Sequence, residues 1–262
     1  MKKIKNIYIF LVLLFLYLPI LVLVFFSFNT SKLNIIFSGF TFKWYKELFM
    51  NIDLLEAFRN TLIVSVTSTI ISTVIGTISA IGLKKFDFKG KKIINEILYI
   101  PIVIPEIVLG IALLSIFTLT KIELGFFTLI LSHISFSIPF VIISVKGILE
   151  SINPNLELSG ADLGANSWQT FFYITLPMLM PGIKSGAMLA FTLSLDDVII
   201  SYFTAGPHSN TLPLKIYSMI KGGISPDVNA LTTLMLLVTC FILFISTYIQ
   251  IKNMKTGSDT YE

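Results

Sequence analysis

Residues 7–28 read IYIFLVLLFLYLPILVLVFFSF, a run without a charged side chain. A helix of about 20 mainly apolar residues is long enough to cross the hydrocarbon layer of a bilayer. The run follows Met1-Lys2-Lys3-Ile4-Lys5, which resembles the basic start of a signal peptide. However, the apolar segment exceeds the roughly 7–15 residues of a signal h-region, and no small-x-small cleavage site follows it. We therefore expect residues 7–28 to be a retained membrane anchor.

The composition of the whole chain also indicates a membrane protein. Its 262 residues are 55% hydrophobic and 13% charged, and the mean hydropathy is +0.87. A soluble domain carries about 25% charged residues, so much of this surface must face something other than water. The net charge is +4, but the lysines lie in short gaps between apolar runs, which argues against a nucleic-acid binder. The single cysteine, Cys240, has no metal-ligand spacing around it, so we expect no metal site.

Further apolar segments reach the length of a membrane span, at about 61–83, 93–118, 124–145, 178–203 and 230–251. With residues 7–28 they predict an all-α membrane protein of six transmembrane helices in one permease domain, residues 1–262. In the second segment Ser68, Ser72, Gly76 and Ala80 recur every four residues and share one helix face. Small residues let membrane helices approach closely, so we expect this face to pack against another helix. The alternative is that it lines a pore.

The basic residues in short loops indicate the orientation of the spans. If the N-terminus is cytoplasmic, 12 of the 19 basic residues fall in cytoplasmic segments: Lys2, Lys3, Lys5, Lys84, Lys85, Lys89, Lys91, Lys92, Lys146, Lys184, Lys252 and Lys255. The density over Lys84–Lys92 decides the orientation. We expect both termini in the cytoplasm.

One gap between the apolar segments is long and polar. Residues 147–177 lie on the expected cytoplasmic side and contain Asn153-Pro154, a capping residue followed by proline at the first helical position. Gly164 stands where a left-handed helix C-cap belongs, Ser167 is expected to cap a second short helix, and Pro177 leads into the fifth span. A helix–glycine–helix segment suits docking into a groove of a partner. The alternative is an ordinary amphipathic linker.

The spacing in this loop resembles the coupling loop of ABC importer permeases. The family pattern is Glu-Ala-Ala, three residues, Gly, nine residues, Ile, one residue, Leu-Pro, and Gly164 has Ile174, Leu176 and Pro177 at that spacing. Leu158-Ser159-Gly160 stands in place of Glu-Ala-Ala, and Glu157 lies one residue early. The resemblance implies a type I ABC importer permease fold with cytoplasmic coupling helices. It also implies contact with an ATP-hydrolysing subunit through Leu158, Asp162, Leu163, Gly164, Ala165, Ile174, Leu176 and Pro177.

No nucleotide-binding or catalytic motif accompanies this loop. The chain has no Gly-x-x-x-x-Gly-Lys-[Ser/Thr] sequence to cradle phosphates, so we expect no cofactor here and ATP bound by a partner subunit. Ser132-His133 and Ser135 are the nearest candidates for a nucleophile and base, but adjacent residues point apart and no Gly-x-Ser-x-Gly surrounds them. We therefore expect a non-catalytic subunit with no catalytic residues.

Acidic residues inside the apolar segments are the candidate substrate contacts. Carboxylates are costly within a membrane and are functional-site hypotheses by default; here they are Glu106 in the third span and Asp196 and Asp197 in the fifth. At 1.5 Å per residue, Glu106 and Asp196 lie roughly 20 and 27 Å from the cytoplasmic ends of their spans, so we expect them along one pathway for a cationic substrate. The alternatives are that Asp197 caps a broken helix and that Glu106 pairs with His133 or is protonated.

Three further stretches resemble the C-type permease of spermidine/putrescine importers. They are Pro105–Leu109, Ser194–Pro207 and Leu212–Leu231. The resemblance implies a polyamine importer in a bacterial cytoplasmic (inner) membrane, made of this chain, a second permease, two ATPase subunits and an extracytoplasmic polyamine-binding protein.

Two rival functions remain on the sequence alone. A permease of the same kind for iron or thiamine would also carry the coupling loop. A secondary transporter would need no ATPase and commonly shows internal repeats, of which we see none.

Overall fold

The computed structural model describes residues 2–32, 36–153, 155–221, 226–238 and 240–241. These residues are overwhelmingly α-helical, and the described part of the chain contains one isolated β-bridge, between Asn29 and Phe40. The all-α prediction is confirmed. The chain separates into two compact units, Met1–Leu55 with Ile216–Glu262, and Glu56–Lys215. That residues 1–262 act as one permease domain stays a prediction.

The first unit contains the predicted anchor as helix α1 (Lys2–Phe26), followed by α2 (Lys43–Met50). The turn between the two helices is fixed by hydrogen bonds. The Trp44 indole Nε1 donates to the backbone oxygen of Asn29 at 2.7 Å, and the hydroxyls of Ser27 and Tyr45 lie 2.6 Å apart. The unit also contains a short apolar helix, Pro226–Val238.

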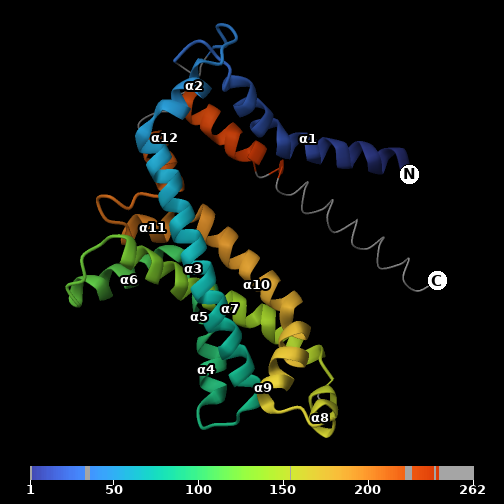
Figure 1. Cartoon of the computed structure of the whole chain (residues 1–262). Helices are drawn as coiled ribbons and strands as arrows, with labels where there is room; N and C mark the ends of the chain where they lie inside the picture. The colour runs from blue at the N-terminus through green and yellow to red at the C-terminus, as the bar shows by residue number, and fades with distance from the viewer. Residues whose placement is uncertain (1, 33–35, 154, 222–225, 239, 242–262) are drawn as a thin grey trace. The chain divides into compact units, whose positions relative to one another are not determined.

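The second unit is built on three long helices, α3 (Ile52–Lys85), α7 (Phe126–Ser151) and α10 (Leu176–Asp196), with all but the start of α3 in this unit (Figure 1). Helix α10 packs along α7. The small-residue face of α3 meets α7, because a Cβ on Gly76 would lie 2.7 Å from Cβ of Val141. Ser68, Ser72 and Ala80 on that face are fully buried. The packing interpretation of this stripe is confirmed.

The described residues contain fewer clear spans than the six predicted. Helices long and apolar enough to cross a membrane are Lys5–Phe26, Ile52–Lys85, Phe126–Ser151 and Ser167–Asp196. A fifth span is formed if the bent pair Lys91–Val103 and Glu106–Leu119 is counted as one. Much of the sixth predicted span, residues 230–251, lies outside the described residues.

The third predicted span, residues 93–118, is broken into shorter helices. The segment forms α4 (Lys91–Ile97), α5 (Ile100–Val103) and α6 (Glu106–Leu119), and the chain bends by 109° between Lys91–Val103 and Glu106–Leu119. The break falls at Ile104, whose backbone is extended with ψ of 135°. Pro105 explains the break, since proline disfavours helical geometry in the preceding residue and has no N–H to continue the ladder.

The fifth predicted span, residues 178–203, is also interrupted. Helix α10 ends at Asp196, Asp197 is extended with ψ of 127°, and the short helix α11 (Ile199–Thr204) follows. Helix α11 packs against α6 and α7. Helix α12 (Leu212–Lys221) comes next in the chain. The two helix breaks, at Ile104-Pro105 and at Asp197-Val198, adjoin the three acids that the sequence singled out.

Candidate functional site

The three predicted acids line one pocket in the second unit. The pocket has a volume of about 350 Å³, and its walls come from α5, the start of α6, α7 and the α10–α11 junction. Glu106, Asp196 and Asp197 all line it, among apolar side chains such as Leu109, Phe136 and Ile199. A pocket of this size falls in the range of small-molecule sites, about 300–1,000 Å³. The sequence therefore identified residues that come together, while their contact with a substrate stays a prediction.

Asp197 is the buried member of the three and carries most of the hydrogen bonds. Its Oδ1 accepts from the Ile200 backbone N–H at 3.1 Å, and its Oδ2 accepts from the Ser201 N–H and hydroxyl, each at 2.7 Å. These N–H groups belong to the first turn of α11, where a helix has no backbone acceptors of its own. Asp197 therefore caps α11, the alternative that the sequence had left open for it.

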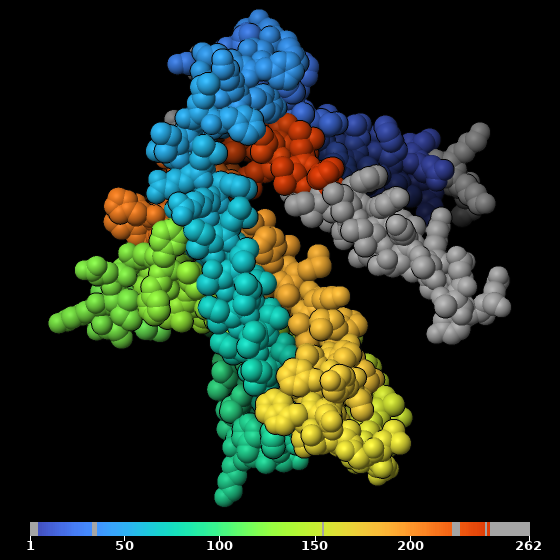
Figure 2. Space-filling model, viewed as in Figure 1, coloured from blue at the N-terminus to red at the C-terminus, as the bar shows by residue number. Residues whose placement is uncertain are grey.

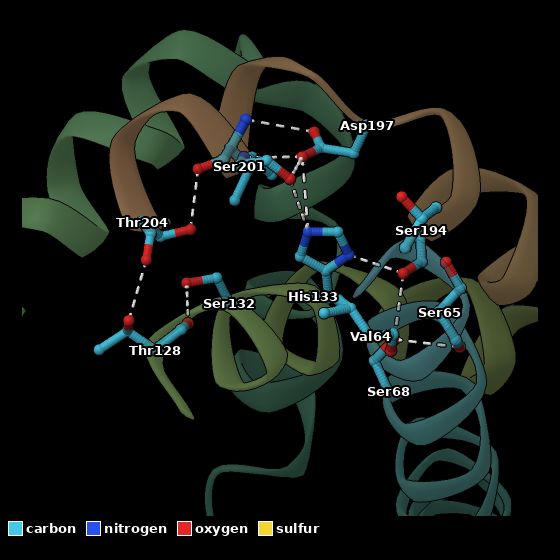
Figure 3. Close-up of polar contacts among 12 residues, drawn as sticks. Val64, Ser65, Ser68, Thr128, Ser132, His133, Ser194, Asp197, Ser201 and Thr204 are labelled. Atoms are coloured by element: carbon cyan, nitrogen blue, oxygen red, sulfur yellow. Dashed lines mark hydrogen bonds and ion pairs between the residues drawn. The ribbon is translucent and has the colours of Figure 1, made fainter. Parts of the chain in front are cut away.

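His133 of α7 joins Asp197 to a buried network of hydroxyls (Figure 3). Its Nε2 lies 3.5 Å from Oδ2 of Asp197 and 3.1 Å from the Ser201 hydroxyl, and its Nδ1 lies 2.6 Å from the Ser194 hydroxyl of α10. The Ser194 hydroxyl in turn lies 3.1 Å from that of Ser68 on α3. The pairing of His133 with Glu106 that the sequence had left open is not formed. The imidazole faces Asp197 instead.

The other two acids are more accessible. Asp196 and Glu106 are exposed, whereas Asp197 keeps 9% of its surface exposed. Among the described residues, no ion pair involves Asp196 or Glu106. Two carboxylates thus line the pocket without an ion pair to a basic side chain of the described segments.

The predicted loop has the expected helix–glycine–helix shape. Helix α8 (Asn155–Asp162) begins after Asn153, whose side-chain oxygen accepts the Asn155 N–H at 3.0 Å. Gly164 adopts a φ of +87°, and the N–H groups of Gly164 and Ala165 bond to carbonyls of α8 at 2.9 and 3.0 Å. This is the left-handed cap predicted for Gly164.

The second short helix differs from the prediction in its cap and its end. Helix α9 (Ser167–Thr170) is capped by Asn166, not Ser167: the Gln169 N–H donates to the Asn166 side chain at 2.9 Å, and the Gln169 side chain accepts the Asn166 N–H at 2.8 Å. It then continues through a π-helical turn, Phe171–Thr175, into α10 at Leu176-Pro177. The loop is therefore joined to a long helix without a break.

Glu157, one residue before the position of the family glutamate, anchors the loop. Its Oε2 lies 2.8 Å from Lys85 Nζ at the end of α3, and its Oε1 accepts from the Thr175 hydroxyl at 2.7 Å. Burial favours the neutral carboxyl, but the hydrogen bonds from Lys85 and Thr175 and the charge of Lys85 outweigh it and hold the pKa of Glu157 below its ordinary value. The sequence does not indicate this role, because Lys85 and Thr175 lie far from Glu157 in the chain. The signal it offers is an acidic residue one position before that of the family glutamate.

The outer face of the loop is apolar and open. Leu163 is 90% exposed, Leu158 is 63% exposed and Tyr173 is 79% exposed. Trp168 and Phe172 are also exposed and stack with ring centroids 5.9 Å apart. Figure 2 shows the α8–α9 segment, in yellow, at the surface of its unit.

Ile174 of the predicted coupling set packs inward, with its Cδ1 close against Gly160 of α8. Leu158 and Leu163 of the predicted coupling set thus form the exposed apolar face, and Asp162 lies exposed beside them.

Comparison with known proteins places most of the chain in one family. The profile of the family described as binding-protein-dependent transport system inner membrane component matches residues 72–256. The spermidine/putrescine transport system permease protein PotC of Escherichia coli strain K12 is 41% identical over 220 residues, 84% of this chain and 83% of that protein. PotC of Haemophilus influenzae is 35% identical over 250 residues, 95% and 97% of the two chains. The putrescine transport system permease protein PotI of E. coli K12 is 35% identical over 235 residues, 87% and 84% of the two chains.

Solved structures support the same fold. A bacterial ABC transporter involved in the import of the acidic polysaccharide alginate matches with a TM-score of 0.74 and 14% identity, over 94% of this chain and 95% of that one. The bacterial alginate ABC transporter in complex with an alginate pentasaccharide-bound periplasmic protein matches with a TM-score of 0.70 and 21% identity, over 93% and 91% of the two chains. At these identities the likeness establishes the fold alone.

Proposed function

The chain belongs to the family of inner membrane components of binding-protein-dependent transport systems, and from this premise we propose that it is the permease subunit of an ATP-driven importer for polyamines. The relatives with 35–41% identity are named for spermidine and putrescine transport. The observation in this chain that supports a polyamine is the pocket with Glu106, Asp196 and Asp197 in its wall. Polyamines are flexible polycations, and exposed carboxylates in an otherwise apolar pocket offset the loss of their hydration.

The proposed assembly follows from what this chain lacks and exposes. It has no phosphate-binding motif, so ATP must be hydrolysed by separate ABC ATPase subunits. The apolar face with Leu158, Leu163 and Trp168 is suited to a hydrophobic groove of such a subunit, with Gly164 and Ala165 setting the turn. A second permease subunit and an extracytoplasmic polyamine-binding protein complete the complex.

We propose a topology of six spans with both termini in the cytoplasm of a bacterium. The spans would be α1, α3, the bent pair α4–α6, α7, the continuous helix from Ser167 through α10, and a last one over about residues 230–251. The lysines at Lys84–Lys92 support a cytoplasmic position for the end of α3, since loops rich in Lys and Arg face the cytoplasm. The α8–α9 loop, anchored to Lys85 by Glu157, then lies on the same side.

Transport in this proposal is alternating access without covalent chemistry in this chain. ATP binding and hydrolysis move the ATPase subunits, and the α8–α9 loop transmits that motion directly to α10, because no flexible linker separates them. The far end of α10 carries Asp196 into the pocket wall. A displacement at the loop therefore reaches the cargo site through one helix.

The test is to neutralise the two accessible acids in the assembled transporter. In proteoliposomes with the partner subunits and binding protein, Glu106→Gln with Asp196→Asn should lower ATP-driven spermidine uptake at least about tenfold, the effect of losing about 1.4 kcal/mol of interaction. Assembly and membrane level should not change. Glu123→Gln, at an exposed acid of the α6–α7 loop, is the matched control and should transport normally. Normal uptake by the double variant would remove the support that the pocket gives to a cationic cargo.

A further inference from the structure

We propose that Asp197 is a positioning residue that fixes α11 and His133 in the pocket wall, and that Glu106 and Asp196 are the acids that meet the cargo. This division of roles among three acids of one pocket rests on the proposed function for the identity of the cargo. The positioning role of Asp197 rests on geometry alone and can be measured without cargo.

The first argument is that the carboxylate of Asp197 is already occupied. Its two oxygens accept from the backbone N–H of Ile200 and from the N–H and hydroxyl of Ser201, and Oδ2 also faces Nε2 of His133 at 3.5 Å. An ionised carboxylate has about four acceptor sites. With four protein groups already directed at it and 9% of the residue exposed, Asp197 retains little capacity to bind an ammonium group from the pocket.

The second argument is what those bonds hold in place. Asp197 stands in the extended break between α10 and α11, and its acceptors fix where the first turn of α11 begins. Ile199 and Ile200 of that turn are part of the pocket wall. The far end of α11 is tied to α7, because the Thr128 hydroxyl donates to the Thr204 carbonyl at 2.9 Å. A shift of Asp197 would therefore move one wall of the pocket.

The third argument is that His133 ties both sides of the break together. One ring nitrogen meets Ser194 on the last turns of α10, and the other meets Ser201 on α11 and Asp197 between them. His133 and Ser201 are fully buried, and Ser194 continues the chain of contacts to Ser68 on α3. The network in Figure 3 thus sets the angle at which α11 leaves α10.

The adjacent residue Asp196 supplies the contrast. It is exposed, lines the same pocket and makes no ion pair within the described part of the chain. Glu106 shares these properties. Replacement of aspartate by asparagine distinguishes the two roles. It removes the charge that would bind cargo, but it keeps one acceptor oxygen and a side chain that caps helices well.

The test compares the amide and alanine variants at both positions, in transporter reconstituted with its partner subunits. Asp197→Asn should retain at least about half of the spermidine uptake per assembled complex, whereas Asp197→Ala should lose about tenfold. Asp196→Asn and Asp196→Ala should both be equally impaired. If Asp197→Asn is as inactive as Asp196→Asn while assembling normally, the charge of Asp197 acts on the cargo and the proposal is overturned.

Double variants separate a positioning role from a general loss of folding. Ser201→Ala removes a hydroxyl that donates to Asp197, so combined with Asp197→Ala it should lower uptake by less than the product of the two single losses. Combined with Asp196→Asn, the same Ser201→Ala change should multiply the two losses, because the residues act in separate ways. Multiplied losses in both pairs would contradict the proposal.

A readout without cargo keeps the inference testable if the transporter moves another solute. In a Cys240→Ser background, which removes the exposed native cysteine, Ile199→Cys places a thiol on the pocket wall. Its rate of modification by an uncharged maleimide should change several-fold with Asp197→Ala but not with Asp197→Asn or Asp196→Asn. Equal rates in all variants would show that Asp197 does not position α11. Absent polyamine uptake by the unmodified transporter would contradict the proposed function only.

Discussion

Glu157 shows how one displaced residue changes the interpretation of a motif. The family pattern places a glutamate at the position of Leu158, so the sequence indicated that the acid had been lost. The structure shows an acid one position earlier that joins α8 to Lys85 and Thr175. Because the pKa of Glu157 is lowered, the contribution of this ion pair is complete at neutral pH and is lost only as the pH falls through that lowered value.

The Lys85–Glu157 pair is expected to act on coupling more than on stability. The side chains of Lys85 and Glu157 are 40% and 32% exposed, and pairs exposed to solvent contribute about 0.2–1 kcal/mol. Glu157→Gln or Lys85→Gln should therefore leave membrane insertion intact but lower uptake per ATP hydrolysed about two- to threefold, measured in proteoliposomes. The exchange Lys85→Glu with Glu157→Lys should recover part of the loss. Single variants with normal coupling would show that the loop needs no such anchor.

At the scale of elements, the sequence predicted the long helices and left their interruptions open. A long apolar run such as residues 124–145 can cross a membrane only if its backbone N–H and C=O groups bond to one another, as they do in a helix. Helix α7 therefore follows from the composition. The Ile104 break follows from Pro105, which the sequence displays. The Asp197 break stayed an open alternative, because it depends on hydrogen bonds that Asp197 accepts from N–H groups three and four residues later and on His133, 64 positions earlier in the chain. The cap at Asn166 was mistaken for Ser167 because both residue types are good caps.

The α8–α9 loop gives the prediction for this scale. Gly164 has a φ of +87° with open space around it, so Gly164→Val costs backbone strain of about 1–2 kcal/mol without a steric clash. The turn should open, and ATP hydrolysis should continue with uptake reduced about tenfold. The matched control is Gly147→Ala in α7, where the glycine has no positive φ and also has open space. Unchanged uptake in Gly164→Val, measured together with ATPase activity, would contradict the coupling role of the loop.

At the scale of the whole molecule, the composition, the loop spacing and three sequence stretches led to the family that the comparisons establish. The described residues contain four helices long and apolar enough to span a membrane, or five with the bent pair, and much of the last apolar run lies outside them. The identity of the partner subunits is not encoded in this sequence. A permease exposes surfaces for them, but their identities depend on other polypeptides.

Uptake of labelled polyamine by cells is the measurement that tests the central claim most directly. A bacterial strain deleted for this chain, and the same strain with the chain restored, would be supplied with labelled spermidine and, separately, labelled putrescine. We expect the deletion to abolish energy-dependent uptake of at least one of them and the restored chain to recover it. Equal uptake of both polyamines with and without the chain, together with a loss of iron or thiamine uptake in the deletion strain, would contradict the account.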